Sequence, residues 1–273
     1  MGLCKDPTVK KLNSLGYNMV KLPRVGIEPL DVLGMEDKSM ELLGSITDVW
    51  TSTATAPVPG APVSVSSING EKSDSLDLAI GLKTLGDALA GLGAGISLPS
   101  LTAGFKNAKK MQFRFVNVES TSVTPFALGR FLSVGTLDMA NPFVSHYFGN
   151  DDTQEYIIVD VLKSNSVSVT AQDQNGVDVA ADVGALSGAL SANVKVSTSS
   201  SSSSEVTFSS TGAKATFAFK IFEVVFENGR WTPQGVKADE SLSFGVSVGG
   251  ESTETQEAGI VLSPGGAVRL KRK

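Results

Sequence analysis

The chain has 273 residues, of which 41% are hydrophobic, and a formal net charge of −5. This length fits one large domain or two small ones with a sizeable buried core. A net negative charge gives no general attraction to nucleic acid, whose backbone selects basic surfaces, so we expect no nucleic-acid partner.

A single cysteine, Cys4, excludes an internal disulfide framework, so a reducing cytoplasm suits the chain best. The first twenty residues hold no continuous apolar stretch of the kind found in signal peptides, and secretion by that route is not expected. No window reaches about 18 uninterrupted apolar residues, the length needed for a membrane-spanning helix. We therefore expect a soluble protein as synthesised.

The N-terminal segment predicts a short helix that Asp6 caps, with Pro7 in its first turn and Gly16 at its end. The following stretch, 17–30, predicts an early strand or edge segment.

Alternation of apolar and polar residues then predicts strands with one exposed face. The alternating segments are 61–65, 111–115, 157–161, 167–171, 194–196 and 206–208. In 217–226 residues of both parities are apolar apart from Lys220 and Glu223, which predicts a strand buried on both faces.

Two segments predict helices instead. Leucines from Leu78 to Leu92, followed by Ile96, step by three and four residues, although five glycines within 81–95 weaken this helix. A second marginal helix is expected between Val179 and Leu190.

The polar run 197–205 consists of serine, one threonine and a glutamate, which predicts a loop that buries nothing. Two linkers are expected near the C-terminus, at 234–241 and 249–259. An apolar patch of Ile260, Val261 and Leu262 follows the second linker.

Residues for catalysis are scarce. The only histidine, His146, cannot form a multi-histidine metal site, and we interpret it as structural. The glycines near residue 93 fit neither nucleotide-binding fingerprint, and the Asp151–Asp152 pair is interpreted as a solvated turn. We therefore expect neither an enzyme nor a metal site.

Basic residues cluster after the first helix, at Lys106, Lys109, Lys110 and Arg114, and again in the C-terminal RLKRK. Such clusters favour an anionic lipid surface by about 1 kcal/mol per charge, and a solvated protein face remains the alternative.

The opening MGLCKDPTVKKLNSLGYNMVKLPR, with Pro29 and Leu30 soon after it, resembles the start of bacterial gasdermins over about thirty residues. The resemblance implies an α+β fold: a twisted, mostly antiparallel central β-sheet with peripheral short helices and a C-terminal inhibitory tail. It also implies a pore-forming domain over 1–248 and a short autoinhibitory tail over 249–273, with an alternative boundary near 235–241.

For function, the resemblance implies a precursor that a partner protease cuts near the tail and that then assembles into a large homo-oligomeric membrane pore. Cell death as a defence against phage is the expected outcome. No cofactor is expected beyond a palmitoyl group on Cys4, and the precursor is expected in the cytoplasm, with the inner membrane as its place after cleavage.

Candidate cleavage residues lie in both linkers, and Ile260 to Leu262 are the candidate inhibitory contact. The cleavage candidates are Gly235, Val236, Lys237, Ala238, Asp239, Gly249, Gly250, Glu251, Ser252 and Thr253. The strands on either side of each weak helix, 61–68 with 111–118 and 157–171 with 194–208, are the candidate inserting hairpins.

Three other classes remain open. They are a β-rich adhesion module, a lipid-carrying β-protein in which Cys4 is only buried, and an enzyme that uses His146 as its base.

Overall fold

A computed structural model describes residues 12 and 14–235, except 37–38, 67, 69–71, 74, 95–96, 151, 189, 191–192, 200–201 and 228. The helices that it defines are short: α2 (Ile46–Val49), α3 (Leu78–Gly91), α4 (Leu98–Gly104), α5 (Pro125–Ser133), α6 (Pro142–Gly149) and α7 (Val183–Ser187). None of these helices is both long and apolar enough to cross a bilayer.

The larger sheet of the described chain has eight strands. Their bounds are β1 (Asn18–Arg24), β2 (Asp31–Glu36), β3 (Ser39–Ser45), β5 (Val63–Ser64), β8 (Glu119–Ser122), β10 (Gln154–Ser164), β14 (Ala215–Glu227) and β15 (Arg230–Gly235). The order is β1-β14-β10-β2-β3, while β15 pairs with β14, β8 with β10 and β5 with β8.

A second sheet has the order β12-β13-β11-β7-β6. Its strands are β6 (Leu76–Asp77), β7 (Lys110–Val116), β11 (Ser166–Gln172), β12 (Val194–Ser199) and β13 (Ser202–Ser210). A two-stranded ribbon joins β4 (Trp50–Ser52) to β9 (Gly135–Leu137). The strand pairs within all three sheets are antiparallel, which confirms the predicted α+β fold class with its peripheral short helices.

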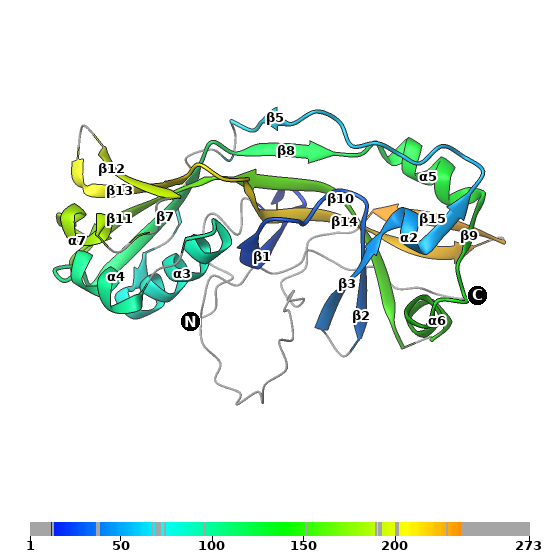
Figure 1. Ribbon diagram of the computed structural model, residues 1–273, viewed down its shortest axis with the longest axis horizontal. Coiled ribbons are helices and arrows are strands. Elements are labelled where there is room, and N and C mark those ends of the chain that lie inside the picture. Colours follow the sequence, from blue (N-terminus) through cyan, green and yellow to red (C-terminus); the bar gives the residue numbers. More distant parts are fainter. Residues whose placement is uncertain are drawn as a thin grey trace.

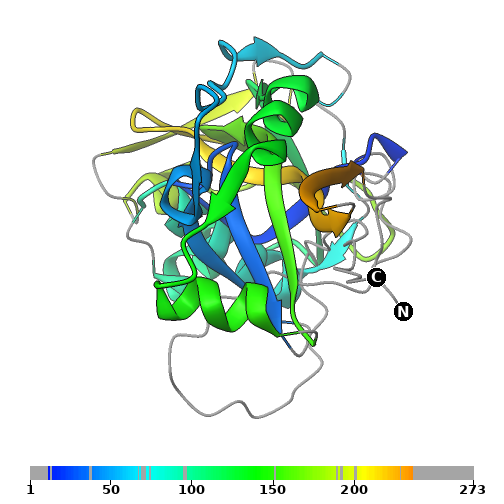
Figure 2. The same ribbon diagram turned by 90° about the vertical axis from the view of Figure 1, so that its right-hand side faces the viewer.

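The two sheets lie end to end along the molecule (Figure 1). Helices α3, α4 and α7 lie beside the five-stranded sheet, whereas α5 and α6 flank the far end of the larger sheet, which faces the viewer in Figure 2. The fold therefore has two ends with different helical covers.

Strands β10 and β14 run through the middle of the larger sheet and are buried on both faces. On β10, Tyr156 and Ile158 belong to one apolar cluster, while Ile157 and Val159 belong to another on the opposite face. The prediction for 217–226 is confirmed, because β14 is buried along most of its length. The expectation that 157–161 has one exposed face was wrong, since clusters of side chains cover both faces.

The chain before β1 follows the predicted course where it is described. Leu12 and Ser14 are helical, and Gly16 then turns the chain with a φ of +80°, a conformation that glycine adopts without strain. Strand β1 pairs with β14, at the edge of the larger sheet, as expected for 17–30.

The predicted strand at 61–65 is largely wrong. Only Val63 and Ser64 form a strand, and they pair with Ser120 and Glu119 of β8. Val63 is 64% exposed, so its alternating pattern does not reflect a buried face.

Candidate functional site

The five-stranded sheet has one largely apolar face. Odd positions on β7 and β11 and even positions on β12 and β13 point to it, as the alternation predicts. Its buried members are Met111, Phe113, Val167, Val169, Ala171, Val194, Val206 and Phe208, which share one cluster with leucines of α3, α4 and α7. Helices, and no second sheet among the described residues, cover this face (Figure 1).

The opposite face of the same strands is polar. The hydroxyls of Ser168 and Thr207 lie 2.6 Å apart, and those of Ser166 and Ser209 lie 2.9 Å apart. Each pair links β11 to β13 through side chains as well as through the backbone. A sheet with one apolar and one polar face is the pattern that a strand between lipid and water requires.

An ion pair crosses the polar face. Arg114 on β7 contacts Glu205 on β13, although β11 lies between these strands. In the strand register Arg114 is opposite Ser168, and Glu205 is opposite Thr170. The expectation that this face of β11 is exposed was wrong: Ser168 is only 2% exposed, because the small hydroxyl side chains lie beneath the longer ones of the flanking strands.

The serine-rich run is not a loop. Strand β12 continues to Ser199 and β13 begins at Ser202, so most of the run forms the two arms of a hairpin. Ser204 is 5% exposed, which contradicts the prediction that the run buries nothing. Ser204 has the parity of Val206 and Phe208, and its hydroxyl donates to the carboxylate of Asp178 at 3.4 Å.

Glycines in α3 and α4 allow close contact with three different neighbours. A Cβ on Gly81 of α3 would lie 2.8 Å from Met111 of β7, and one on Gly104 of α4 would lie 2.3 Å from Leu186 of α7. At Gly91 a Cβ would lie 1.7 Å from the carbonyl oxygen of Pro23 in β1. The predicted first helix is confirmed as α3, and its glycines also have a packing role that periodicity did not reveal.

The second predicted helix is much shorter than expected. Only Val183–Ser187 is helical, while Val179 donates its backbone N–H to the carbonyl of Ala171 and so continues the sheet edge. Glycine at 184 and 188 weakens a helix that only one fully buried residue, Leu186, anchors to the core.

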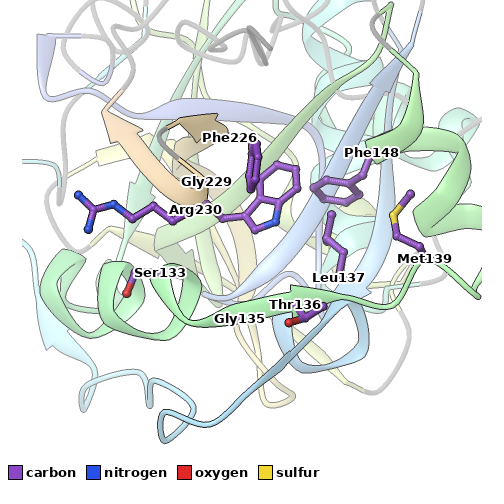
Figure 3. Close-up of a pocket in the computed structure, with 10 residues that line it drawn as sticks. Ser133, Gly135, Thr136, Leu137, Met139, Phe148, Phe226, Gly229 and Arg230 are labelled. Atoms are coloured by element: carbon purple, nitrogen blue, oxygen red, sulfur yellow. The ribbon is translucent and has the colours of Figure 1, made fainter. Parts of the chain in front are cut away.

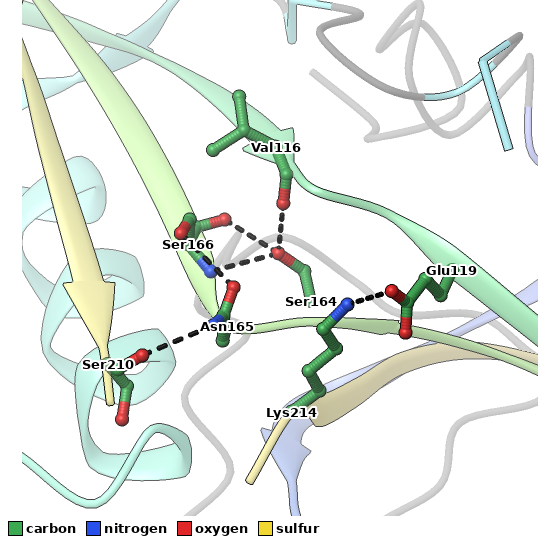
Figure 4. A network of polar contacts seen from close by, with 7 residues as sticks. All are labelled: Val116, Glu119, Ser164, Asn165, Ser166, Ser210 and Lys214. Carbon is green, nitrogen blue, oxygen red and sulfur yellow. Dashed lines mark hydrogen bonds and ion pairs between the residues drawn. The ribbon is translucent and has the colours of Figure 1, made fainter. Parts of the chain in front are cut away.

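The two sheets meet at a polar seam, which we define as residues 116–119, 164–166 and 210–214. The chain passes between the sheets here three times, from β7 to β8, from β10 to β11 and from β13 to β14. The Ser164 hydroxyl contacts the carbonyl of Val116 and accepts the Ser166 N–H at 3.0 Å (Figure 4). Asn165 and Ser210 exchange two hydrogen bonds, of 3.2 Å and 2.8 Å. The seam thus joins all three connections.

Two further contacts tie the seam together. Lys214 forms an ion pair with Glu119 across it (Figure 4). Asn117 turns the chain between β7 and β8 with a φ of +56°, which asparagine tolerates better than most residues.

Comparison with known proteins identifies the family. The sequence profile described as "Bacterial Gasdermin Family" matches residues 20–230. The chain belongs to this family. Similar relatives are Gasdermin bGSDM of Vitiosangium sp., 37% identical over 85% of this chain and 86% of the relative, and Gasdermin bGSDM of Lysobacter enzymogenes, 30% identical over 84% and 83%.

The fold agrees with this assignment. The solved structure of a bacterial gasdermin from Bradyrhizobium tropiciagri superposes with a TM-score of 0.64, at 16% sequence identity, and the match covers 88% of this chain and 96% of that one. The resemblance inferred from the first thirty residues is thereby confirmed, and the chain is a gasdermin of the pore-forming kind.

The basic residues of this gasdermin have different surroundings. Lys106 and Lys109 are exposed after α4, whereas Lys110 and Arg114 are partly buried on β7. Both residues of β7 lie at even positions, on the polar face of the sheet. Their contact with lipid stays a prediction.

His146 lies on the exposed side of α6, where its ring meets Tyr147 edge to face, with 5.1 Å between centroids. The described residues contain no group of three or more histidine, cysteine, aspartate or glutamate side chains that could hold a metal.

Several predicted site residues lie outside the described part of the gasdermin. These are Cys4, the linker residues 236–239 and 249–253, and the patch 260–262. Gly235 is the last described residue and ends β15, so both candidate domain boundaries at the tail stay predictions.

Proposed function

We propose that this gasdermin is the autoinhibited precursor of a membrane pore. A protease removes the C-terminal tail, and the released unit oligomerises, inserts β-hairpins into the inner membrane and kills the cell in defence against phage. The precursor stays in the cytoplasm, and a palmitoyl group on Cys4 helps to seat the cleaved unit in the bilayer.

The two-faced five-stranded sheet is the observation that carries this proposal. Its apolar face already has the alternation that a barrel presents to lipid, and its polar face has the serine, threonine and charged side chains that suit a water-filled lumen. Helices cover the apolar face, so exposing it requires only that α3, α4 and α7 move or unfold.

Strand length shows what else has to change. A strand needs about 9–11 residues to cross a bilayer at the usual tilt. Strands β7 and β11 have 7 residues each, and β13 has 9. The inserted hairpins therefore need residues from the neighbouring helices, and glycine-weakened helices give up their structure at low cost.

The partners of the first hairpin differ from those expected from sequence. Strand β7 pairs with β6, whereas the segment at 63–64 pairs with β8 in the other sheet. We therefore build the first hairpin from β7 and the segment that holds α3 and α4, and the second from β11 and the β12–β13 segment.

Site-directed cleavage tests the proposal. A recognition sequence for a specific protease is inserted after Asp239, and the purified protein is mixed with dye-filled liposomes. Dye release on addition of the protease is expected, with the uncut protein and a scrambled insertion as controls. Cut protein that stays unable to release dye would overturn autoinhibition by the tail.

A pair of adjacent positions tests the inserted face. Val196 is partly buried on the apolar face, and Ser197 is exposed on the polar face. In a Cys4→Ser background, Val196→Cys and Ser197→Cys are each labelled with a polarity-sensitive fluorophore. After cleavage on liposomes the label at 196 should report an apolar environment and the label at 197 an aqueous one. Identical responses would contradict insertion as an alternating strand.

A further inference from the structure

A cavity, drawn in Figure 3, lies among elements at the end of the molecule opposite the five-stranded sheet (Figure 1). Its volume is about 580 Å³, within the range of small-molecule sites. The end of α5, β9, α6 and the β14–β15 hairpin all contribute to it. Its apolar lining consists of Leu137, Met139, Phe148, Phe226 and Trp231.

The aromatic side chains of this lining contact one another. The Trp231 ring lies 5.6 Å from Phe148 and 5.0 Å from Phe226, between centroids, with steep angles between their planes. Gly229 makes the tight turn before Trp231 with a φ of +76°, a conformation that residues with a side chain rarely adopt. The cavity is thus shaped before any ligand arrives.

The polar part of the lining is cationic. Arg230 is the cationic residue of the described lining, and in Figure 3 its guanidinium extends away from the aromatic rings. Thr136 adds a hydroxyl, whereas the Ser133 hydroxyl donates to the carbonyl of Arg130, and no carboxylate is among the described residues that line the cavity. Asp138 comes between two lining residues in the chain, but its carboxylate accepts the backbone N–H of Ala140 at 3.3 Å. A guanidinium at the outer end of an apolar cavity fits the phosphate of a ligand whose apolar part contacts the aromatic rings.

Apolar side chains are also exposed at this end. Met139 and Phe226 are 46% and 37% exposed while lining the cavity, and Val134, between two lining residues, is 52% exposed. Phe143, in the first turn of α6, is 69% exposed. An apolar surface around the opening disfavours a free, water-soluble ligand and favours a lipid surface.

We propose that this cavity binds an anionic phospholipid of the bilayer, with one acyl chain against the aromatic lining and the phosphate on Arg230. The inference rests on the proposed action at a membrane, and it gives that action a lipid preference. Every described element of the site lies outside the five-stranded sheet on which the pore proposal rests.

Tryptophan quenching tests the site directly. The chain has two tryptophans, Trp50 and Trp231, and Trp50→Phe leaves one reporter, on the cavity wall. The uncut full chain is titrated with lysophosphatidylglycerol whose acyl chain carries bromine, below its micelle concentration. Saturable quenching is expected, about tenfold weaker with Arg230→Ala or with the zwitterionic lysophosphatidylcholine of the same chain. Equal affinity for the two headgroups would overturn the role of Arg230.

A matched pair of variants locates the lipid. Met139→Asp puts a charge in the apolar lining, whereas Phe126→Asp puts one on a 92% exposed residue of α5 that does not line the cavity. Only Met139→Asp should lose quenching. Loss in both variants, or in neither, would place the lipid elsewhere and overturn the proposal.

Dye release separates this proposal from the pore itself. Cleaved Met139→Asp protein should need more phosphatidylglycerol in the liposomes than cleaved Phe126→Asp protein to release the same amount of dye. Equal release from both would overturn the lipid site and leave the pore standing, whereas no release from any cleaved protein would overturn the pore.

Discussion

The glycines of α3 can be tested with one substitution at each of two positions. Gly91→Ala adds a Cβ that would lie 1.7 Å from the carbonyl oxygen of Pro23, where ordinary contact begins near 3.4 Å. The helix or β1 therefore has to move by about 1.7 Å. Gly86→Ala adds the same atom in the same helix, but its nearest neighbour, the Leu101 Cδ1, is 4.0 Å away.

The two substitutions should have opposite effects on the free energy of unfolding. Alanine improves on glycine by about 1 kcal/mol in a helix, so Gly86→Ala should stabilise the protein by about that amount. Overpacking against backbone costs about 1–3 kcal/mol or more, so Gly91→Ala should be net destabilising despite the same helical gain.

Urea unfolding followed by circular dichroism measures both effects on the uncut chain. If Gly91→Ala stabilised the protein as much as Gly86→Ala, the glycine would serve only to weaken the helix, and close contact between α3 and β1 would be refuted. A destabilised Gly86→Ala protein would contradict the inference that a Cβ fits at this position.

Three further perturbations follow from individual contacts. Tyr17→Phe, which removes a 2.7 Å hydrogen bond to Asp160, should lower the free energy of unfolding by about 1.5–3 kcal/mol at neutral pH. Burial raises the pKa of Tyr17, and the hydrogen bond to Asp160 and the charge of Asp160 raise it further. The wild type should therefore lose this stability as pH rises above about 10. The Tyr17→Phe variant should lose less stability than the wild type over the same alkaline range. A double-mutant cycle on Arg114→Ala and Glu205→Ala should give a coupling energy of about 1 kcal/mol that falls with added salt, and zero coupling would contradict the ion pair. Trp50→Phe should cost less than about 2 kcal/mol by urea unfolding, because the buried indole N–H has no acceptor among the described residues; a loss above about 3 kcal/mol would indicate that it has one.

The sequence predicted the faces of the functional sheet better than its surroundings. Parity alone placed Val167, Val169, Val206 and Phe208 on one face, because side chains alternate along any strand. It could not tell that Ser168 on the other face is buried, since that depends on which long side chains the neighbouring strands place above it.

The errors have local physical causes. Serine has no strong strand preference, so composition favoured a loop at 197–205, where β12 and β13 pair as a hairpin and β13 also pairs with β11. The second helix has only five residues, because Gly184 and Gly188 lower the helix propensity of a segment whose apolar spacing is typical of a longer helix.

Some missed elements did carry a readable signal. Helices α5 and α6 both start with proline at the first helical position, after Thr124 and Asn141, whose side chains accept a backbone N–H of the first turn. The cavity carried no such signal, because Met139, Phe226 and Trp231 come together only through the pairing of β14 with β15 and the path of β9.

The seam between the sheets also bears on how relatives of this chain can diverge. Its three connections are short and bonded to one another, so a length change within 116–119, 164–166 or 210–214 would shift two sheets at once. The connections from α3 to α4 and from α7 to β12 instead start and finish at elements packed on a single sheet, and added residues there cost little loop entropy. Insertions and deletions among relatives should therefore gather in the helical layer, and the spacing of the three seam segments should persist where residue identity has been lost.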